Sequence, residues 1–218
     1  MAAMATPERA MTTGAVAIGQ HHDRTVAPLW IVVTVVAAVL GALAGWQIRS
    51  LFQRPIPAAL GQDLAYLATL VSVLIASGAQ WLLFRRWRHD AFWWVPATVG
   101  ASLLTAAIIV PTVLNVFTTP LGFPTLSQSI IVGTVALGAS GLVIGLAQAL
   151  ALHASAGNGA WLWAPATGLG GALAGAITTA LAVQLLGLPA YAFISLVAAT
   201  SALLTAACQV PVLRRLLR

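Results

Sequence analysis

Charge is scarce in this chain. Charged residues make up only 6% of its 218 residues, and no lysine occurs. A soluble domain carries about 25% charged residues, which help to cover its water-facing surface. Because 60% of the residues here are hydrophobic, most of the exterior is expected to face lipid. The composition therefore predicts an integral membrane protein rather than a soluble domain.

Residues that hold metals and cofactors are also few. The chain has one cysteine, Cys208, with four histidines and four acids. Only His21-His22-Asp23 brings such residues together, and an adjacent pair of histidines in a tail is weak evidence for a metal site. No glycine motif for binding phosphates or dinucleotides occurs. The sequence predicts no metal, no cofactor and no enzymatic activity.

The net charge of +6 is carried by arginine alone. Basic charge can indicate nucleic-acid binding. Here the arginines lie beside apolar runs, which is typical of residues that set membrane topology. We therefore expect no nucleic-acid partner.

Six apolar runs are long enough to cross a bilayer, which takes about 20 residues. No Asp, Glu, Arg or His lies in the middle of any run. Because backbone polar groups must be satisfied within lipid, each run is predicted to be an α-helix. The runs are Pro28–Ile48, Leu64–Phe84, Trp93–Leu114, Ser129–Ala151, Trp161–Leu186 and Ala190–Leu213.

Residues 1–27 show no apolar periodicity, and we expect a flexible cytoplasmic tail there. A signal peptide cleaved after Ala42-Leu43-Ala44 is an alternative for the first run, although the repeat described below gives that run a place in the architecture. Residues 28–213 form the predicted transmembrane domain, and residues 214–218 a basic cytoplasmic tail.

Arginines are divided unequally between the two predicted sides. The side with both termini holds Arg9, Arg24, Arg85, Arg86, Arg88, Arg214, Arg215 and Arg218. The other side holds only Arg49 and Arg54. The positive-inside rule then places both termini in the cytoplasm, with the chain in the inner or plasma membrane.

The stretch Gln80 to Thr98 has a weaker copy from Gln148 to Thr167. Each odd run begins with a tryptophan, and a threonine follows four positions later. Each even run ends with a glutamine, and a basic or imidazole side chain follows five positions later. This pattern predicts three parallel two-helix hairpins, over about 30–85, 94–153 and 163–214.

Tryptophan at a helix start and arginine after a helix end are typical of the membrane–water interface. The predicted interface anchors are Trp30, Trp94, Trp163, Arg85, Arg86, Arg214 and Arg215. The glutamines lie about one turn deeper, where an unpaired amide is costly. Gln80, Gln148 and Gln209, with Thr34, Thr98 and Thr167 at similar depth, are therefore predicted to join helices or to form a polar ring around a vestibule.

Glycine pairs four positions apart permit close contact between helices. Such pairs are Gly41 with Gly45, Gly141 with Gly145, and Gly171 with Gly175. They predict tight packing within the bundle or an interface between copies of the chain.

The segment Gly138-Ala139-Ser140-Gly141 resembles the G-x-S-G motif of rhomboid intramembrane proteases, whose serine also lies in a fourth helix. A buried serine nucleophile needs a base. The sixth run, which holds that base in rhomboids, contains no histidine here. His153 follows Ser140 by thirteen residues, or about 20 Å along one helix. Ser140 is therefore expected to be a packing residue.

One broader resemblance covers most of Trp30 to Arg215. Ser77-Gly78-Ala79-Gln80 with Trp81, and Gly145-Leu146-Ala147-Gln148, each precede a short turn and a W-[VA]-P-A segment. This arrangement is similar to a group of uncharacterised bacterial multi-pass membrane proteins. The resemblance implies a fold and no activity. The third copy departs from the pattern because Val210 and Pro211 follow Gln209.

The expected fold is an all-α polytopic bundle of six transmembrane helices. The expected function is that of a non-enzymatic membrane protein that acts as an accessory, scaffold or lipid-interacting component. Its expected partners are the lipid bilayer and a membrane protein or a second copy of the chain. The alternative is a small pore or permease for a neutral solute, with the glutamines at the cytoplasmic mouth.

Overall fold

The computed structural model describes residues 8–51, 58–86, 91–118, 125–185 and 187–217. Helices account for nearly all of these residues, and no strand occurs among them. The prediction of an all-α fold is confirmed. Arg54, Arg88 and Arg218, which entered the orientation argument, lie outside the described residues.

The chain forms seven α-helices and three short helical segments within the described ranges. In order they are α1 (Glu8–Leu51), α2 (Ala58–Phe84), η1 (Ala91–Trp93), α3 (Trp94–Leu104), η2 (Thr105–Ile109), α4 (Val110–Thr118), α5 (Leu126–Ala156), η3 (Gly157–Leu162), α6 (Trp163–Gln184) and α7 (Ala190–Leu216). The segments η1 and η3 are 3₁₀ turns at the starts of α3 and α6, whereas η2 is a π-helical turn between α3 and α4. Pro111, which lacks a backbone N–H, follows this π turn within α4.

Five helical segments are long and apolar enough to cross a membrane. They are Thr25–Leu51, Asp63–Phe84, Ala91–Phe117, Leu126–Ala154 and Ala190–Leu216. The remaining predicted run corresponds to α6, which has 22 residues and is rich in glycine and threonine. The chain therefore has the helices that a multi-pass membrane protein requires.

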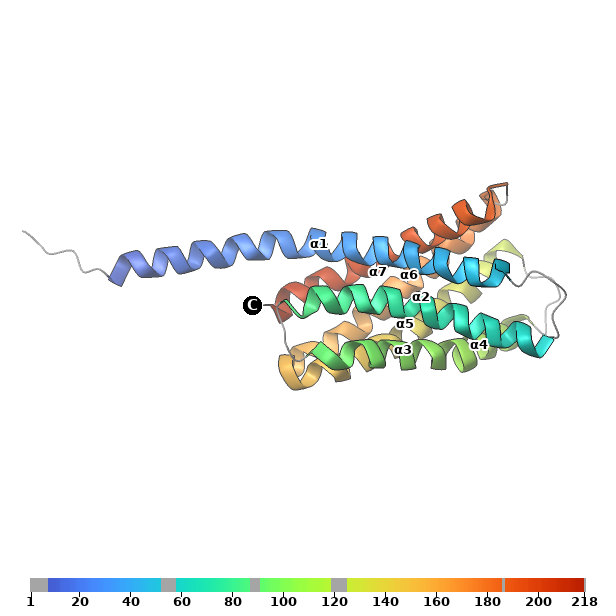
Figure 1. Cartoon of the computed structure of the whole chain (residues 1–218), viewed down its shortest axis with the longest axis horizontal. Helices are drawn as coiled ribbons and strands as arrows, with labels where there is room; N and C mark the ends of the chain where they lie inside the picture. Colours follow the sequence, from blue (N-terminus) through green and yellow to red (C-terminus); the bar gives the residue numbers. More distant parts are fainter. Residues whose placement is uncertain (1–7, 52–57, 87–90, 119–124, 186, 218) are drawn as a thin grey trace, which may run out of the picture.

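The first helix begins earlier than the sequence predicted. Residues 8–27 were expected to form a flexible tail, but they continue α1, and Pro28 lies inside the helix. Helix propagation adds one hydrogen bond for each residue that is fixed, and this segment contains several alanines, which are strong helix formers. The extension projects from the bundle at the end where the C-terminus lies (Figure 1).

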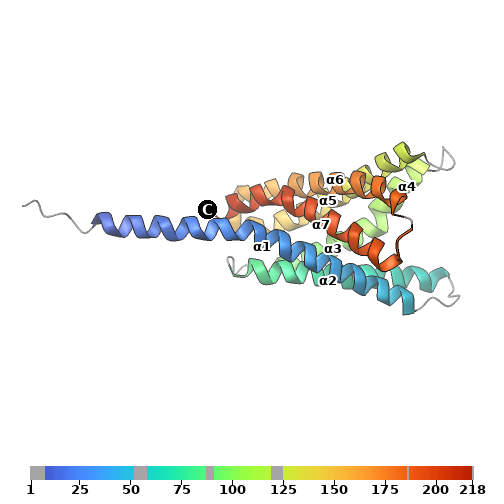
Figure 2. The ribbon, with the colours of Figure 1, turned by 90° about the horizontal axis from the view of Figure 1, so that it is seen from above.

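The helices converge at that end and diverge toward the other (Figure 2). The ends of α2, α5 and α7 and the starts of α3 and α6 meet at the convergent end (Figure 1). The largest buried side chains lie there, in one cluster that includes Trp30, Phe84, Trp94, Leu152, Trp163 and Leu213. The main hydrophobic cluster thus occupies one end of the bundle, which we call the closed end.

Glycines bring neighbouring helices into close contact inside the bundle. A Cβ atom on Gly145 of α5 would lie 2.8 Å from the Cα atom of Ala164 on α6. On α1, Gly41 faces Ser72 of α2, whose hydroxyl donates to the Gly41 carbonyl at 2.7 Å. The glycine pairs that the sequence singled out therefore pack within this chain.

Candidate functional site

Three tryptophans from α1, α3 and α6 meet at the closed end. Trp30, Trp94 and Trp163 are each 0% exposed, and their ring centroids lie 5.4 to 6.3 Å apart. Each pair meets edge to face, with interplanar angles of 80° or 81°. This geometry suits the aromatic quadrupole and adds about 0.5–1.5 kcal/mol for each pair. We call these residues the tryptophan triad.

Burial of the triad corrects the prediction that Trp30, Trp94 and Trp163 are interface anchors. Their rings pack on one another, and none of the three indoles reaches the molecular surface. Two tryptophans close to the triad in sequence are exposed instead, since Trp93 is 64% exposed and Trp161 is 40% exposed. The helical turn places adjacent residues on different faces, so one tryptophan of the Trp93-Trp94 pair faces outward and the other inward.

Three further side chains complete the seal at the closed end. Phe84, Leu152 and Leu213 are each buried to 1% exposure or less. The Phe84 ring contacts all three tryptophans, with centroid distances of 4.8 to 5.9 Å. Each of the three residues follows a glutamine of the repeat by four positions, on the same helix face. This four-residue spacing is visible in the sequence, but the prediction did not include it.

A belt of amides and hydroxyls lies one helical turn further from the closed end. Gln148 donates from Nε2 to Thr98 Oγ1 at 3.0 Å, and its Oε1 accepts from Trp163 Nε1 at 2.8 Å. Gln209 makes the corresponding bonds to Thr167 at 2.9 Å and to Trp30 at 3.2 Å. The Gln209–Trp30 bond joins the last helix to the first. We call the three glutamines with Thr34, Thr98 and Thr167 the amide belt.

The threonines of the belt link the amides to the backbone. Thr98 donates its hydroxyl to the Trp94 carbonyl at 2.7 Å, and Thr167 donates to the Trp163 carbonyl at 2.8 Å. Each hydroxyl therefore accepts from a glutamine and donates to a tryptophan carbonyl. Such chains strengthen the individual hydrogen bonds, since each one polarises the next.

The belt is open at one place, between α2 and α3. Gln80 donates to Thr34 at 3.3 Å, the longest bond from a belt glutamine to its threonine. Trp94 occupies the position equivalent to Trp30 and Trp163, but its Nε1 is buried and has no hydrogen-bond partner among the described residues. A Trp94–Gln80 bond, the counterpart of the other two, is absent from the described hydrogen bonds.

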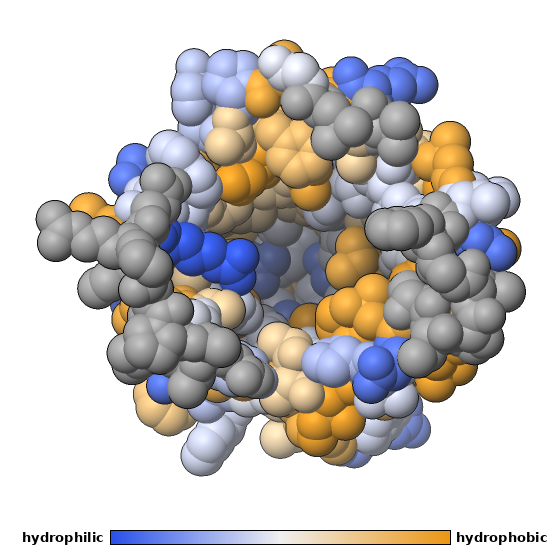
Figure 3. All heavy atoms as spheres, turned by 90° about the vertical axis from the view of Figure 1, so that its right-hand side faces the viewer, coloured by the Kyte–Doolittle hydropathy of each residue, from blue (hydrophilic) through white to orange (hydrophobic). Residues whose placement is uncertain are grey.

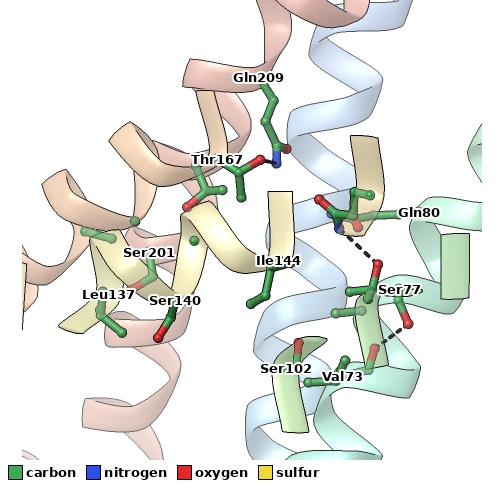
Figure 4. A pocket seen from close by; sticks show the side chains of 17 residues that line it. Val73, Ser77, Gln80, Ser102, Leu137, Ser140, Ile144, Thr167, Ser201 and Gln209 are labelled. Carbon is green, nitrogen blue, oxygen red and sulfur yellow. Dashed lines mark hydrogen bonds between the residues drawn. The ribbon is translucent and has the colours of Figure 1, made fainter. Parts of the chain in front are cut away.

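A cavity of about 290 Å³ lies directly above the belt. Viewed from the end opposite the C-terminus, the molecule has a hollow at its centre, with hydrophilic residues in its depth (Figure 3). The side chains that line the cavity come from α2, α3, α5, α6 and α7 and include all three belt glutamines (Figure 4). Because the tryptophan triad lies below them, the glutamines form the floor of the cavity. They are not at the mouth on the side of the termini, as the permease alternative had placed them.

No ionisable side chain is found among the described residues that line the cavity. Apolar residues such as Val73, Leu137 and Ile144 alternate with hydroxyl residues. The hydroxyl residues are Ser77, Thr98, Ser102, Ser140, Thr167, Ser201 and Thr205. A mostly apolar cavity with a few fixed hydrogen-bonding groups has the chemistry of a small-molecule site.

The predicted arginine anchors lie at the surface of the closed end. Arg85, Arg86, Arg214 and Arg215 are all exposed. The Arg85 guanidinium stacks over the Trp81 ring, 5.2 Å from its centroid. Arginine side chains at such positions can reach water or lipid headgroups beside the bundle.

Ser140 lines the cavity and has no histidine beside it. His153, on the same helix, is exposed at the closed end, where its Nδ1 lies 3.2 Å from the Gly157 carbonyl and its ring packs on Trp161. No group of three or more potential metal ligands occurs among the described residues. The cavity therefore presents hydrogen-bonding chemistry without a nucleophile–base pair.

Comparison with family models, curated proteins and solved structures found no match to this chain.

Proposed function

We propose that this protein is an integral membrane protein with six membrane-spanning helices arranged as three parallel hairpins. The five long apolar segments support this assignment, as do the equivalent hydrogen bonds that Gln148 and Gln209 make. The protein lies in an inner or plasma membrane with both termini on the cytoplasmic side. The exposed arginines of the closed end then lie beside the lipid headgroups. The resemblance to bacterial multi-pass membrane proteins fits this proposal.

We further propose that the cavity admits a small uncharged solute, as in a permease seen closed toward the cytoplasm. The observation that carries this proposal is the uncharged cavity, which is hollowed from one end and closed at the other by the tryptophan triad. An ion would be costly to place there, because no opposite charge faces it. A neutral solute can meet the unused hydrogen-bonding capacity of the floor. The proposed activity is non-enzymatic and needs no cofactor.

Stopped-flow light scattering of proteoliposomes tests this proposal. After a jump in erythritol concentration, vesicles with the protein should re-swell faster than empty vesicles, whereas a jump in potassium chloride should give equal traces. Ile144→Trp should slow the re-swelling, because Ile144 lines the cavity and the larger ring would fill it. Leu150→Trp, at a 61% exposed position on the same helix, is the matched control. Equal rates with and without protein would refute solute passage.

A second candidate function is that of a scaffold or accessory component, alone or as a homo-oligomer. The observation in its favour is the part of α1 that projects beyond the bundle (Figure 2). Such a helix offers a docking surface for another membrane protein. Deletion of residues 2–24 should abolish capture of a partner in mild detergent and leave solute entry unchanged. Capture that survives the deletion would remove the reason for this candidate.

A further inference from the structure

The cavity wall carries hydroxyl groups at regular heights above its floor. Ser102 follows Thr98 by four residues on α3, and Thr205 precedes Gln209 by four on α7. At about 1.5 Å per residue, both lie roughly 6 Å above the belt. Ser140 and Ser201 precede Gln148 and Gln209 by eight residues, which places them roughly 12 Å above it. All four line the cavity, and we call them the hydroxyl ladder.

Ser140 is the member of the ladder that most clearly lacks a protein partner. It is 7% exposed, and its Oγ has no hydrogen bond among the described residues. Several other hydroxyl groups of the lining have hydrogen-bond partners within the protein. Ser77 donates to the Val73 carbonyl at 2.6 Å, and Thr98 and Thr167 also donate to carbonyls of their own helices. A buried hydroxyl without a partner is costly unless a ligand or water supplies one. Figure 4 shows Ser140 and Ser201 together on one side of the cavity.

The floor of the cavity has hydrogen-bonding capacity to spare. A glutamine amide offers two N–H donors and a carbonyl oxygen with two lone pairs. Gln148 and Gln209 each use one donor and one lone pair within the belt. Gln80 donates to Thr34, and its Oε1 makes no hydrogen bond to the Trp94 indole. Amides at the floor and hydroxyls along the wall therefore offer both donors and acceptors.

We infer that the hydroxyl ladder and the amide belt bind a short linear polyol, an uncharged molecule with hydroxyl groups spread along its length. The two heights of the ladder match such a molecule better than one with a single polar head, which would leave part of the ladder unpaired. A hydrocarbon chain would bury the Ser140 hydroxyl without a partner, at the cost just described. A charged solute finds no counterion in the lining. This inference rests on the cavity function proposed above and names its ligand class.

Binding of tritiated erythritol to the full-length protein in nanodiscs, followed by scintillation proximity, tests the inference without any need for transport. We expect saturable binding that unlabelled erythritol displaces. 1-Butanol, with the same number of carbons and one hydroxyl, and erythronate, the charged counterpart, should displace it poorly. Ser140→Ala and Ser201→Ala should each weaken binding about fivefold, the value of one hydrogen bond near 1 kcal/mol. Ser129→Ala on α5 and Ser195→Ala on α7 make the same change outside the cavity lining and should leave the affinity unchanged.

A second measurement guards against effects of the substitutions on folding. In a Cys208→Ala, Ser140→Cys background, methyl methanethiosulfonate should modify the introduced thiol, and erythritol should slow this reaction at the concentrations that saturate binding. The inference is overturned if erythritol does not bind saturably, if 1-butanol competes equally well, or if the control variants weaken binding as much as the ladder variants.

Binding and passage can fail separately. Saturable erythritol binding without re-swelling of proteoliposomes would support the ligand class and refute the permease. Re-swelling without saturable binding would support the permease and overturn the hydroxyl ladder as a binding site.

Discussion

The contacts that close the bundle at α5–α6, α1–α7 and α2–α3 use the same residue types but different bonds. At the first two, a tryptophan N–H donates to a glutamine that also bonds a threonine. At α2–α3, within the described part of the chain, the Trp94 N–H has no partner and the Gln80 side chain bonds only Thr34. We call these contacts the two bonded seams and the open seam. An unpaired buried N–H costs about 1–3 kcal/mol, so the open seam is expected to separate first.

The glutamines of the bonded seams are also more deeply buried than the glutamine of the open seam. Gln148 and Gln209 are each 3% exposed, whereas Gln80 is only partly buried. The amide that lacks a tryptophan partner is thus the one that solvent or solute in the cavity reaches most easily. Burial in lipid gives little hydrophobic gain between helices, so packing and hydrogen bonds carry the difference between the seams. The same repeated sequence pattern therefore gives two bonded seams and one open seam.

The largest expected effect is the difference in stability loss between a substitution in the buried triad and one at an exposed neighbour. Trp94→Ala should lower the free energy of unfolding by about 3 kcal/mol or more, because it removes a fully buried ring that packs on three others. Trp93→Ala, one residue away and 64% exposed, should change it by less than about 0.5 kcal/mol. Thermal unfolding in detergent measures both. Equal losses would mean that the triad does not hold the closed end together.

The next effect compares the seams through their glutamines. Gln148→Leu leaves the Trp163 N–H without its acceptor and removes the donor to Thr98, and we expect a loss of about 2–3 kcal/mol. Gln80→Leu breaks a single long bond and should cost about 1 kcal/mol or less. Denaturant unfolding of the two variants in the same detergent gives the comparison. A larger loss for Gln80→Leu would show that the open seam is held by bonds as strong as those of the bonded seams.

Much of the fold could be predicted from the sequence. Length and hydropathy were enough to find the helices, because every long apolar run must satisfy its own backbone hydrogen bonds. The spacing of Gln80, Gln148 and Gln209 relative to Thr34, Thr98 and Thr167 was also informative. It placed these residues at one depth, where the structure joins each glutamine to a threonine.

The direction of the tryptophans could not be predicted in the same way. A tryptophan at a helix start is compatible with a headgroup contact and with a contact inside the bundle, and depth alone does not separate the two. The missing signal was on the neighbouring residues. Ala27, Ala91 and Ala160, each three positions before a triad tryptophan, are all buried, and small residues there let the rings approach one another. The start of α1 was missed because weak periodicity does not prevent an alanine-containing segment from extending a helix that already exists.

A smaller effect isolates the indole N–H. Trp163→Phe keeps an aromatic ring but removes the donor to Gln148 Oε1, whereas Trp94→Phe removes a donor that has no partner. Both lose volume, so the difference between them reports the hydrogen bond. We expect Trp163→Phe to be about 1 kcal/mol more destabilising than Trp94→Phe. Thermal unfolding of the two variants side by side tests this, and an equal loss would place a partner on the Trp94 N–H.

The smallest expected effect is also the most direct test of the open seam. In a double-mutant cycle, Trp163→Phe and Gln148→Leu should show a coupling of about 0.6 kcal/mol, the average found for hydrogen bonds between membrane helices. Trp94→Phe and Gln80→Leu should show a coupling near zero, since the Trp94 N–H has no partner to lose. A coupling at Trp94–Gln80 that equals the one at Trp163–Gln148 would mean that all three seams are closed.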